Sequence, residues 1–385
     1  MAITEIIDEL VARAARERAS DIHLVPEADR LRVRLRIDGL LQEEPSLPMS
    51  LHPEAIARLK IMAGLRTDEH QAAQDGRFRT TGAGIGTIDV RVAIAPTHHG
   101  ENAVLRLLPE KPDEFDLGAL GVSATDRGLI ERAAGKSHGL ILATGPTGSG
   151  KTTTLYALTA LRNSASTAVT TIEDPVEYAI GGVTQIPVNA RSGLTFATGL
   201  RAVLRQDPDV IMVGEVRDAE TAGLAAGAAL TGHLVLTTLH TNDAVTALPR
   251  LLDLKVEPYL IATAVSLVIG QRLVRRICAE CREPVEPSAA ERERLAELAA
   301  TGVPNAFFRG RGCDKCRGTG YRGRVGLYEV LALGDDLRDA ILRKAPASDL
   351  RLLAELEGLT PMLTDGLTKV EGGVTTVEEI LRTLS

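Results

Sequence analysis

The sequence has no tryptophan, five phenylalanines and five tyrosines among its 385 residues. Its core must therefore be built from aliphatic side chains, and few rings remain on which the bases of single-stranded nucleic acid could stack. Long apolar runs are also missing, and without about 18 consecutive apolar residues no segment is expected to span a bilayer. The first part of the chain is rich in charge and lacks the apolar core of a signal peptide. We therefore expect a cytoplasmic protein, and docking on a membrane stays open.

Basic residues are not in excess either. The 44 lysines and arginines stand against 51 aspartates and glutamates, so the formal net charge of −7 gives no general reason to expect nucleic-acid binding. The four cysteines are too few for the disulfide framework of a small secreted protein. The hydrophobic fraction of 44% is ordinary for a globular protein, and the length predicts two or three domains.

The first part of the chain, residues 1–108, predicts a small α+β domain of the PAS-like kind. Apolar residues recur at helical spacing over 3–18, and 51–66 also favours a helix. Half-buried strands are predicted where apolar and polar residues alternate, in 22–24, 31–37 and 88–92, and a further strand in 102–108. The polar stretch 109–116, which contains two prolines, is predicted to be a linker.

The middle of the chain, residues 117–275, predicts a RecA-like α/β domain. Apolar strand candidates alternate with helical segments, an order that favours a parallel sheet with crossover helices. The strand candidates are 140–143, 168–172, 210–213 and 234–239. Residues 276–325 hold the four cysteines and little regular structure, and 326–385 predict a C-terminal helical region. Its last helix is expected to have Thr375 as N-cap and Glu378 as the reciprocal capping-box residue.

A phosphate-binding loop follows the first strand candidate and leads into a predicted helix. It fits the pattern GxxxxGK[ST] at every fixed position: Gly145, Pro146, Thr147, Gly148, Ser149, Gly150, Lys151 and Thr152. Glycines let backbone N–H groups turn towards a phosphate, and the helix N-terminus adds its positive end. Lys151 would place its charge at the β- and γ-phosphates of ATP, and the Thr152 hydroxyl would ligate Mg²⁺. Thr153 completes the predicted nucleotide-binding segment.

Two acidic segments follow predicted strands. In phosphate-loop ATPases a strand beside the loop strand delivers a carboxylate to the Mg²⁺ or the attacking water, and strand 210–213 leads to such an acid, Glu215. A glutamate there can orient or deprotonate water, as a general base must. The cluster 171–178, which contains Glu177, gathers further carboxylates at a strand end, where parallel α/β sheets bind ligands. For each segment the alternative is a solvated acidic loop.

Histidine and arginine candidates are not decided by residue type alone. His240 follows a predicted strand and could sense the γ-phosphate, but a lone histidine is usually structural. A positioned guanidinium can stabilise the charge of phosphoryl transfer, and the candidates are Arg91, Arg106, Arg201 and Arg205. Arg91 and Arg106 precede the ATPase domain, so they could reach a phosphate only if the first domain folds over this site or a neighbour's. Otherwise each is a solvated surface charge.

Two CxxC pairs, separated by 31 residues, form a metal-binding pattern. The spacing favours tetrahedral Zn²⁺ bound by four thiolates, those of Cys278, Cys281, Cys313 and Cys316. A closed site of this kind is structural, because no coordination position is left open. The alternatives are two redox-active pairs or free buried thiols, and the thioredoxin-like βαβ pattern that a redox pair would want is missing here.

Taken together, these residues resemble the secretion ATPase superfamily, whose members power type II secretion and type IV pilus assembly. The resemblance runs over essentially the whole chain, from 19–24 to 373–376. Segment 171–178 looks like the family's Asp box, 204–218 its Walker B segment and 231–242 its His box, and 74–77 and 96–101 match the signature of its N-terminal domain.

The resemblance implies a role for each candidate residue. Glu215 matches the catalytic glutamate, Glu177 the Asp-box acid that helps to place water and metal, and His240 the His-box residue near the γ-phosphate. Arg91 and Arg106 match the arginines that the N-terminal domain brings to the phosphates, and Arg201 and Arg205 match those before Walker B. The four cysteines match the zinc element of the secretion and pilus-extension branches, which the retraction branch lacks.

The resemblance also implies a Mg²⁺-dependent ATPase that works as a homohexameric ring on inner-membrane platform proteins. We expect it to attach to the inner membrane face through them and to make no direct contact with nucleic acid. Type II secretion is the first hypothesis, and extension of a type IV or competence pilus is the alternative. Typical members of the family carry a further N-terminal domain before the part that this sequence matches. We therefore expect a short form of the family that lacks this domain. A helicase-like motor and a nucleotide-gated scaffold remain as hypotheses of other classes.

Overall fold

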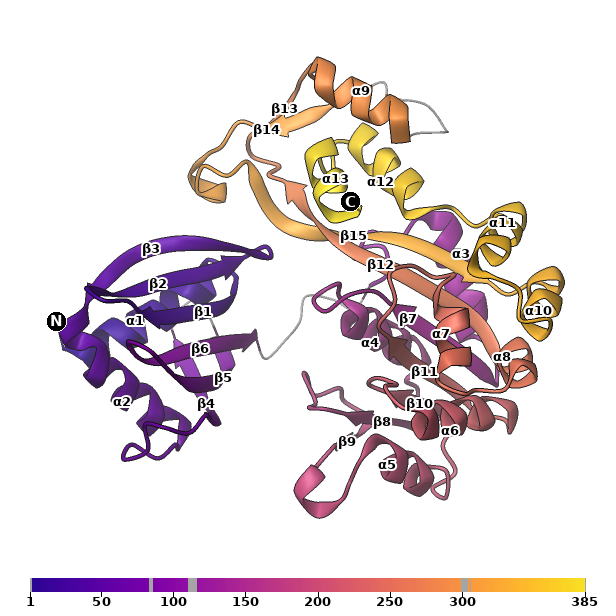
Figure 1. The fold of residues 1–385 in the computed structure, drawn as a ribbon, viewed down its shortest axis with the longest axis horizontal. Coiled ribbons are helices and arrows are strands. Elements are labelled where there is room, and N and C mark those ends of the chain that lie inside the picture. The colour runs from indigo at the N-terminus through magenta and orange to yellow at the C-terminus, as the bar shows by residue number, and fades with distance from the viewer. Residues whose placement is uncertain (1, 83–85, 110–115, 299–303, 305, 385) are drawn as a thin grey trace. The chain divides into compact units, whose positions relative to one another are not determined.

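The structure, a computed structural model, describes residues 2–82, 86–109, 116–298, 304 and 306–384 (Figure 1). It divides into two compact units, Met1–Asp113 and Glu114–Ser385, which are described separately below. Most of the linker expected over 109–116 lies outside the described residues. Within the described residues no helix combines the length and apolar character needed to cross a bilayer.

The first unit is an antiparallel sheet with two helices. Its strands lie in the order β3-β2-β1-β6-β5-β4. They are β1 (Ala19–Pro26), β2 (Arg30–Ile37), β3 (Leu40–Pro48), β4 (Gln74–Gly82), β5 (Gly86–Thr97) and β6 (Gly100–Pro109), and the helices are α1 (Ile3–Arg16) and α2 (His52–Ala63). Apolar side chains of both helices share one core with one face of the sheet. In β2, for example, Leu31, Val33 and Leu35 are buried between arginines that face the other side. The α+β architecture is as expected, whereas the PAS-like assignment stays a prediction.

The second unit is built on a seven-stranded sheet in the order β15-β12-β7-β11-β10-β8-β9. Its strands are β7 (Gly139–Thr144), β8 (Val169–Glu173), β9 (Thr184–Pro187), β10 (Val210–Val213), β11 (Leu234–Leu239), β12 (Val265–Ile277) and β15 (Tyr321–Ala332). Every neighbouring pair is parallel except β12 and β15. The expected α/β fold with a parallel sheet is therefore confirmed.

Helices cover both faces of this sheet. Leu140 and Leu142 of β7 point into a core shared with α6 and α8, while Ile141 and Ala143 point into a second core shared with α3 and α4. The helices are α3 (Ala124–Ala134), α4 (Lys151–Arg162), α5 (Phe196–Val203), α6 (Ala219–Leu230), α7 (Ala247–Asp253), α8 (Pro258–Ala264), α9 (Ala289–Leu298), α10 (Asp335–Leu342), α11 (Ala347–Leu356), α12 (Met362–Glu371) and α13 (Val377–Leu384). Because both faces are buried, the central strands are apolar throughout rather than alternating.

The strand order corrects one expectation. The strand that leads to Glu215, β10, was expected beside the loop strand β7, but β11 lies between them. The periodicity of a buried parallel strand carries no information about its neighbours, so this order could not be obtained from the apolar runs.

The cysteine-bearing segment has more regular structure than expected. It contains α9 and a small antiparallel pair of strands, β13 (Arg282–Pro284) and β14 (Phe308–Gly310). The long strand β15 then crosses the boundary expected between 325 and 326 and pairs along β12, so the C-terminal region begins as a strand before its helices (Figure 1). The two strands join this segment directly to the sheet.

The last helix, α13, begins one residue later than expected. Its capping hydroxyl is that of Thr376, which accepts a hydrogen bond from the Glu379 N–H at 3.3 Å, while the Thr375 hydroxyl donates to the carbonyl of Arg275 at 2.8 Å. The Glu379 carboxylate is fully buried and paired with Arg275 at 2.7 Å and Arg382 at 2.8 Å. Burial alone would raise the pKa of Glu379, but these hydrogen bonds outweigh it and lower the pKa from 4.5 to about 2.

We predict that Glu379→Gln lowers the free energy of unfolding of the second unit by about 3 kcal/mol at neutral pH, because it leaves the half-buried Arg275 without its counter-charge. Because the pKa of Glu379 is lower in the folded state, the stabilisation by its ionised carboxylate is fully present above pH 4.5 and is lost as the pH falls towards about 2. The measurement is urea unfolding followed by circular dichroism. The difference in free energy of unfolding between the variant and the wild type should become smaller as the pH falls. The exposed neighbour provides the control Glu378→Gln, and an equal effect of both substitutions would contradict the assignment.

Candidate functional site

The phosphate-binding loop connects β7 to α4 and depends on glycine at both ends. Gly150, the N-cap of α4, has φ of +87°, in the left-handed region that side chains rarely adopt. Gly145 has φ of +148°, and a Cβ there would lie 2.3 Å from the carbonyl oxygen of Gln271 on β12. The backbone can therefore turn sharply at the end of the sheet and present its N–H groups to an anion.

Lys151 is buried at the first position of α4. Its ammonium group donates to the carbonyls of Gly145 and Pro146, both at 2.9 Å, so it is held inside the loop. Burial lowers the pKa of Lys151 from 10.5 to about 8, and the nearby negative charge of Glu215 opposes this shift. Thr152 is exposed beside it. The loop thus holds a desolvated cation whose present partners are neutral carbonyls, and a phosphate would be a stronger partner.

Glu215 and His240 are brought together by two adjacent parallel strands. Glu215 follows β10 and His240 follows β11, and parallel strands end at the same edge of a sheet. The distance from Glu215 Oε2 to His240 Nε2 is 3.2 Å, and to Arg217 Nε it is 2.7 Å. The Glu215 side chain is 15% exposed, so a water molecule can reach it. Arg217 was missed from the sequence, where nothing distinguished it from other surface arginines.

The acidic segment after β8 is organised by a buried glutamate, Glu173. Its carboxylate accepts hydrogen bonds from Thr171 Oγ1 at 2.6 Å, from Gln185 Nε2 at 3.0 Å and from the Tyr156 hydroxyl. The same hydroxyl accepts from the backbone N–H of Glu177 at 3.2 Å. Burial and the Glu173 carboxylate raise the pKa of Tyr156, so the phenol stays neutral and donates. Tyr156 therefore ties the Glu177 backbone to α4.

Tyr156 and Glu173 were not singled out from the sequence. A buried tyrosine looks like any core residue, and Glu173 stands with two other acids in segment 171–178. Their pairing joins α4 to the far end of β8, the next strand in the chain, over 17 residues. The structure thus places Lys151, Glu215, His240 and Glu177 in the segments that follow β7, β10, β11 and β8, at one edge of the sheet.

The arginine candidates fall into two groups. Arg91 and Arg106 belong to the first unit and are direct cross-strand neighbours on β5 and β6, and Arg77 of β4 stands opposite Arg91. Directly opposed residues point to the same face, so three guanidinium groups lie in one row. Arg106 also contacts the buried Asp21, with Nε and Oδ1 3.2 Å apart.

Arg201 lies in the last turn of α5 in the second unit, and Arg205 follows two residues after the helix ends. Arg201 pairs with Glu220 of α6, and an Arg205 guanidinium N–H donates to the carbonyl of Arg201 at 2.8 Å. Neither contact involves the phosphate-binding loop, so both arginines remain predictions for this site.

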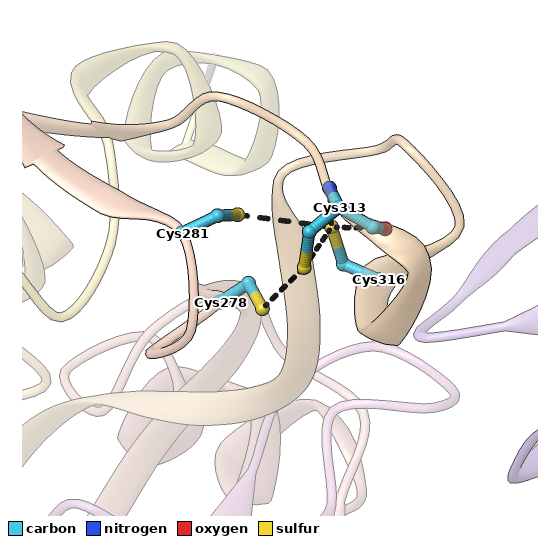
Figure 2. Close-up of side chains that lie close together, drawn as sticks. All are labelled: Cys278, Cys281, Cys313 and Cys316. Atoms are coloured by element: carbon cyan, nitrogen blue, oxygen red, sulfur yellow. Dashed lines mark hydrogen bonds between the residues drawn. The ribbon is translucent and has the colours of Figure 1, made fainter.

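The four cysteines form a compact cluster (Figure 2). Their sulfur atoms all lie within 4.8 Å of one another, and the pairs 278–313, 281–316 and 313–316 are 3.9, 3.8 and 3.7 Å apart. Four sulfurs each about 2.3 Å from a tetrahedral zinc ion would be about 3.8 Å apart, so the cluster has the dimensions of such a site.

Backbone groups also prepare the cluster for thiolates. The N–H groups of Cys313 and Gly320 point at the sulfur of Cys316, at 3.1 and 3.3 Å. Burial would raise the pKa of Cys316, but these donors outweigh it and lower the pKa to about 7. The donor set is therefore consistent with zinc binding.

Comparisons with known proteins agree with this geometry. The model of the family "Type II/IV secretion system protein" matches residues 1–382. The chain belongs to this family. It is 45% identical over 380 residues to the "Type II secretion system protein E" of Pseudomonas aeruginosa, covering 99% of this chain and 75% of the relative. It is 41% identical over 385 residues to the "Type IV pilus assembly ATPase PilB" of Myxococcus xanthus, covering 98% and 67%.

A solved structure of similar fold is the crystal structure of the pilus retraction motor PilT with bound ADP. It has a TM-score of 0.66 and 28% sequence identity, and the match covers 99% of this chain and 96% of that one. As a family member with a complete phosphate-binding loop, the chain is an ATPase of the secretion and pilus type. The resemblance stated from the motifs is confirmed.

We predict that the purified family member holds about one zinc ion per chain, and that replacing Cys313 and Cys316 by serine releases it. The two remaining thiolates cannot close a tetrahedral site, so the segment from Cys278 to Gly320 should become sensitive to proteolysis. Elemental analysis measures the metal directly, and Glu215→Gln, which leaves the cluster intact, is the control. Protein purified without added chelator that contained no zinc would refute the assignment.

Proposed function

We propose that this protein is a Mg²⁺-dependent ATPase that works as a homohexameric motor and powers protein export through a type II secretion system. The proposal rests mainly on the positions of a buried lysine, a glutamate and a histidine. Each of them follows one of three parallel strands, and these strands end at the same edge of the sheet. The similar PilT structure contains bound ADP, which supports nucleotide binding by this chain.

In this proposal the loop binds the phosphates of ATP. The backbone N–H groups of the loop 145–150, in which Pro146 has none, and the ammonium of Lys151 bind the β- and γ-phosphates, with Thr153 beside them in the first turn of α4. Mg²⁺, ligated by the Thr152 hydroxyl, would neutralise charge on the β- and γ-phosphate oxygens when bound. ATP would replace the loop carbonyls as the partner of Lys151.

Glu215 acts on the water. Its carboxylate orients a water molecule and accepts its proton while the water oxygen bonds to the γ-phosphorus and the bond to the ADP oxygen breaks. His240, 3.2 Å from the carboxylate, senses the γ-phosphate, and Arg217 restricts the glutamate rotamer. Glu177, whose backbone is tied to α4 through Tyr156, helps to place water and metal.

The arginines stabilise the negative charge that develops during phosphoryl transfer. Arg91 and Arg106, neighbours in one row of the first unit, bind the phosphates when that unit closes over a nucleotide site, of this subunit or of the next. Arg201 of α5 and Arg205, just after this helix, contribute further positive charge. Closure and release of the first unit then convert hydrolysis into motion. A zinc ion on the four cysteines is structural and takes no part in hydrolysis.

A series of three variants tests the enzyme. Lys151→Ala should abolish ATP binding and hydrolysis, while Glu215→Gln should bind ATP but turn it over at least about a hundredfold more slowly, as expected for loss of a general base. Arg106→Ala should lower turnover and leave folding intact. Phosphate release and binding of a fluorescent ATP analogue are the measurements. Turnover by Glu215→Gln at the wild-type rate would remove Glu215 from the mechanism.

The proteins that bind to this ATPase will decide whether it drives a secretion system or a pilus. We propose type II secretion first, because a secretion relative reaches 45% identity while two pilus relatives reach 41% and 43%; pilus extension is the alternative. The motor would attach to the cytoplasmic face of the inner membrane through platform proteins. Affinity capture with Glu215→Gln and ATP from native membranes should recover secretion-platform proteins. Recovery of a pilus platform and a major pilin would assign the chain to extension instead.

A further inference from the structure

We propose that Gln271 is a positioning residue for ATP binding, which holds the Ser149–Gly150 peptide in the orientation that the phosphates require. The inference rests on the proposed function, since it assumes that the loop binds MgATP. It assigns a task to a side chain on β12, which lies 122 residues from Ser149 in the chain.

The sheet places Gln271 beside the loop. Strand β12 runs parallel to β7, and their register ends with Gly270 opposite Thr144. One residue further, β7 becomes the phosphate-binding loop while β12 continues, so Gln271 stands next to Gly145. The two backbones are so close there that a Cβ on Gly145 would lie 2.3 Å from the Gln271 carbonyl. The Gln271 side chain itself is buried, with 1% of the residue exposed.

The Gln271 side chain holds the loop and the helix together. Its amide Nε2 donates to the carbonyl of Ser149 at 2.6 Å, and its Oε1 accepts from the Thr154 hydroxyl at 2.8 Å. The orientation of the amide follows from its partners, because a carbonyl can only accept and therefore must face the NH₂ group. One buried side chain thus fixes both the last loop residue before Gly150 and the first turn of α4.

The contact with Ser149 determines where the Gly150 N–H points. A trans peptide is planar, and its C=O and N–H point in opposite directions. With the Ser149 carbonyl held towards Gln271, the Gly150 N–H points to the opposite side of the loop, away from β12. Without the amide donor, a buried carbonyl would lose its partner, and rotation of the peptide towards another donor would also turn the N–H.

The same strand continues to the four-cysteine cluster, because β12 ends at Ile277 and Cys278 follows. Gln271 is also paired directly with Tyr328 of β15. The side chain that orients the loop therefore belongs to the strand pair that carries the C-terminal region. A test of Gln271 must therefore distinguish weaker nucleotide binding from destabilisation of this strand pair.

The first test is Gln271→Leu, which removes both hydrogen bonds at similar volume. We expect the affinity for MgATP to fall at least about tenfold and KM to rise with it, while kcat falls less, because the loop can still be closed by saturating nucleotide. The control Thr159→Val changes another buried threonine of α4, whose hydroxyl donates to the sulfur of Met212 at 3.6 Å. It should bind MgATP like the wild type.

The second test, Gln271→Glu, applies even if the leucine variant does not fold. A protonated glutamic acid can donate to the Ser149 carbonyl as the amide does, whereas the carboxylate cannot and repels it. The affinity of this variant for MgATP should therefore fall as the pH rises towards neutrality, along a profile that the wild type does not share. Identical pH profiles, together with unchanged KM in Gln271→Leu, would overturn the role of Gln271. Failure of the wild type to bind MgATP would instead overturn the proposed function.

Discussion

The close approach of the loop to β12 is the constraint on which the site depends. At Gly145 the chain leaves β7 with no room for a side chain, because the carbonyl of Gln271 occupies that space. The backbone must then turn at once, and the turn delivers Lys151 to the start of α4 with its ammonium inside the loop. A residue with a Cβ at position 145 would separate β7 from β12, and the loop would lose its support.

Around this loop the structure concentrates charge in a small, partly dehydrated space. The buried lysine and Glu215 influence each other electrostatically, and Glu215 is also held by a histidine and an arginine from the same sheet edge. Burial of Lys151 strengthens its attraction to Glu215, whereas the pairs of Glu215 with the exposed Arg217 and His240 are screened by water. Tyr156 of α4 and Glu173 of β8 hold the acidic segment through hydrogen bonds. Positions close to the expected chemistry are thus fixed by different kinds of interaction.

The C-terminal region is attached to the same sheet through one long strand pair. Strand β12 passes from the loop to Cys278, and β15 returns beside it from Gly320, close to the sulfur of Cys316. The buried Glu379 holds α13 against β12 through Arg275. In Figure 1 this region is joined to the ATPase sheet by these strands and is not a separate lobe on a linker. The C-terminal region and the phosphate-binding loop are therefore both attached to β12.

Short-range patterns in the sequence were sufficient for much of this protein. The phosphate-binding loop, the strands before it and after it, the acid at 215 and the two CxxC pairs are all defined by residue type and spacing over a few positions. The resemblance built on them was confirmed by the family match. These features depend on local geometry, such as glycine at positive φ or two thiols three residues apart, which the sequence states directly.

Only the tertiary structure decided which strand neighbours which and which side chains meet. It placed β11 between β7 and β10, moved the cap of α13 from Thr375 to Thr376, and revealed the partners Arg217, Tyr156 and Gln271. The contact between Gln271 and Ser149 joins residues 122 positions apart. From the sequence alone, the glutamine is only one of several polar residues in this strand. Side-chain hydrogen bonds of this range depend on strand order, and strand order depends on how the whole sheet buries its two faces.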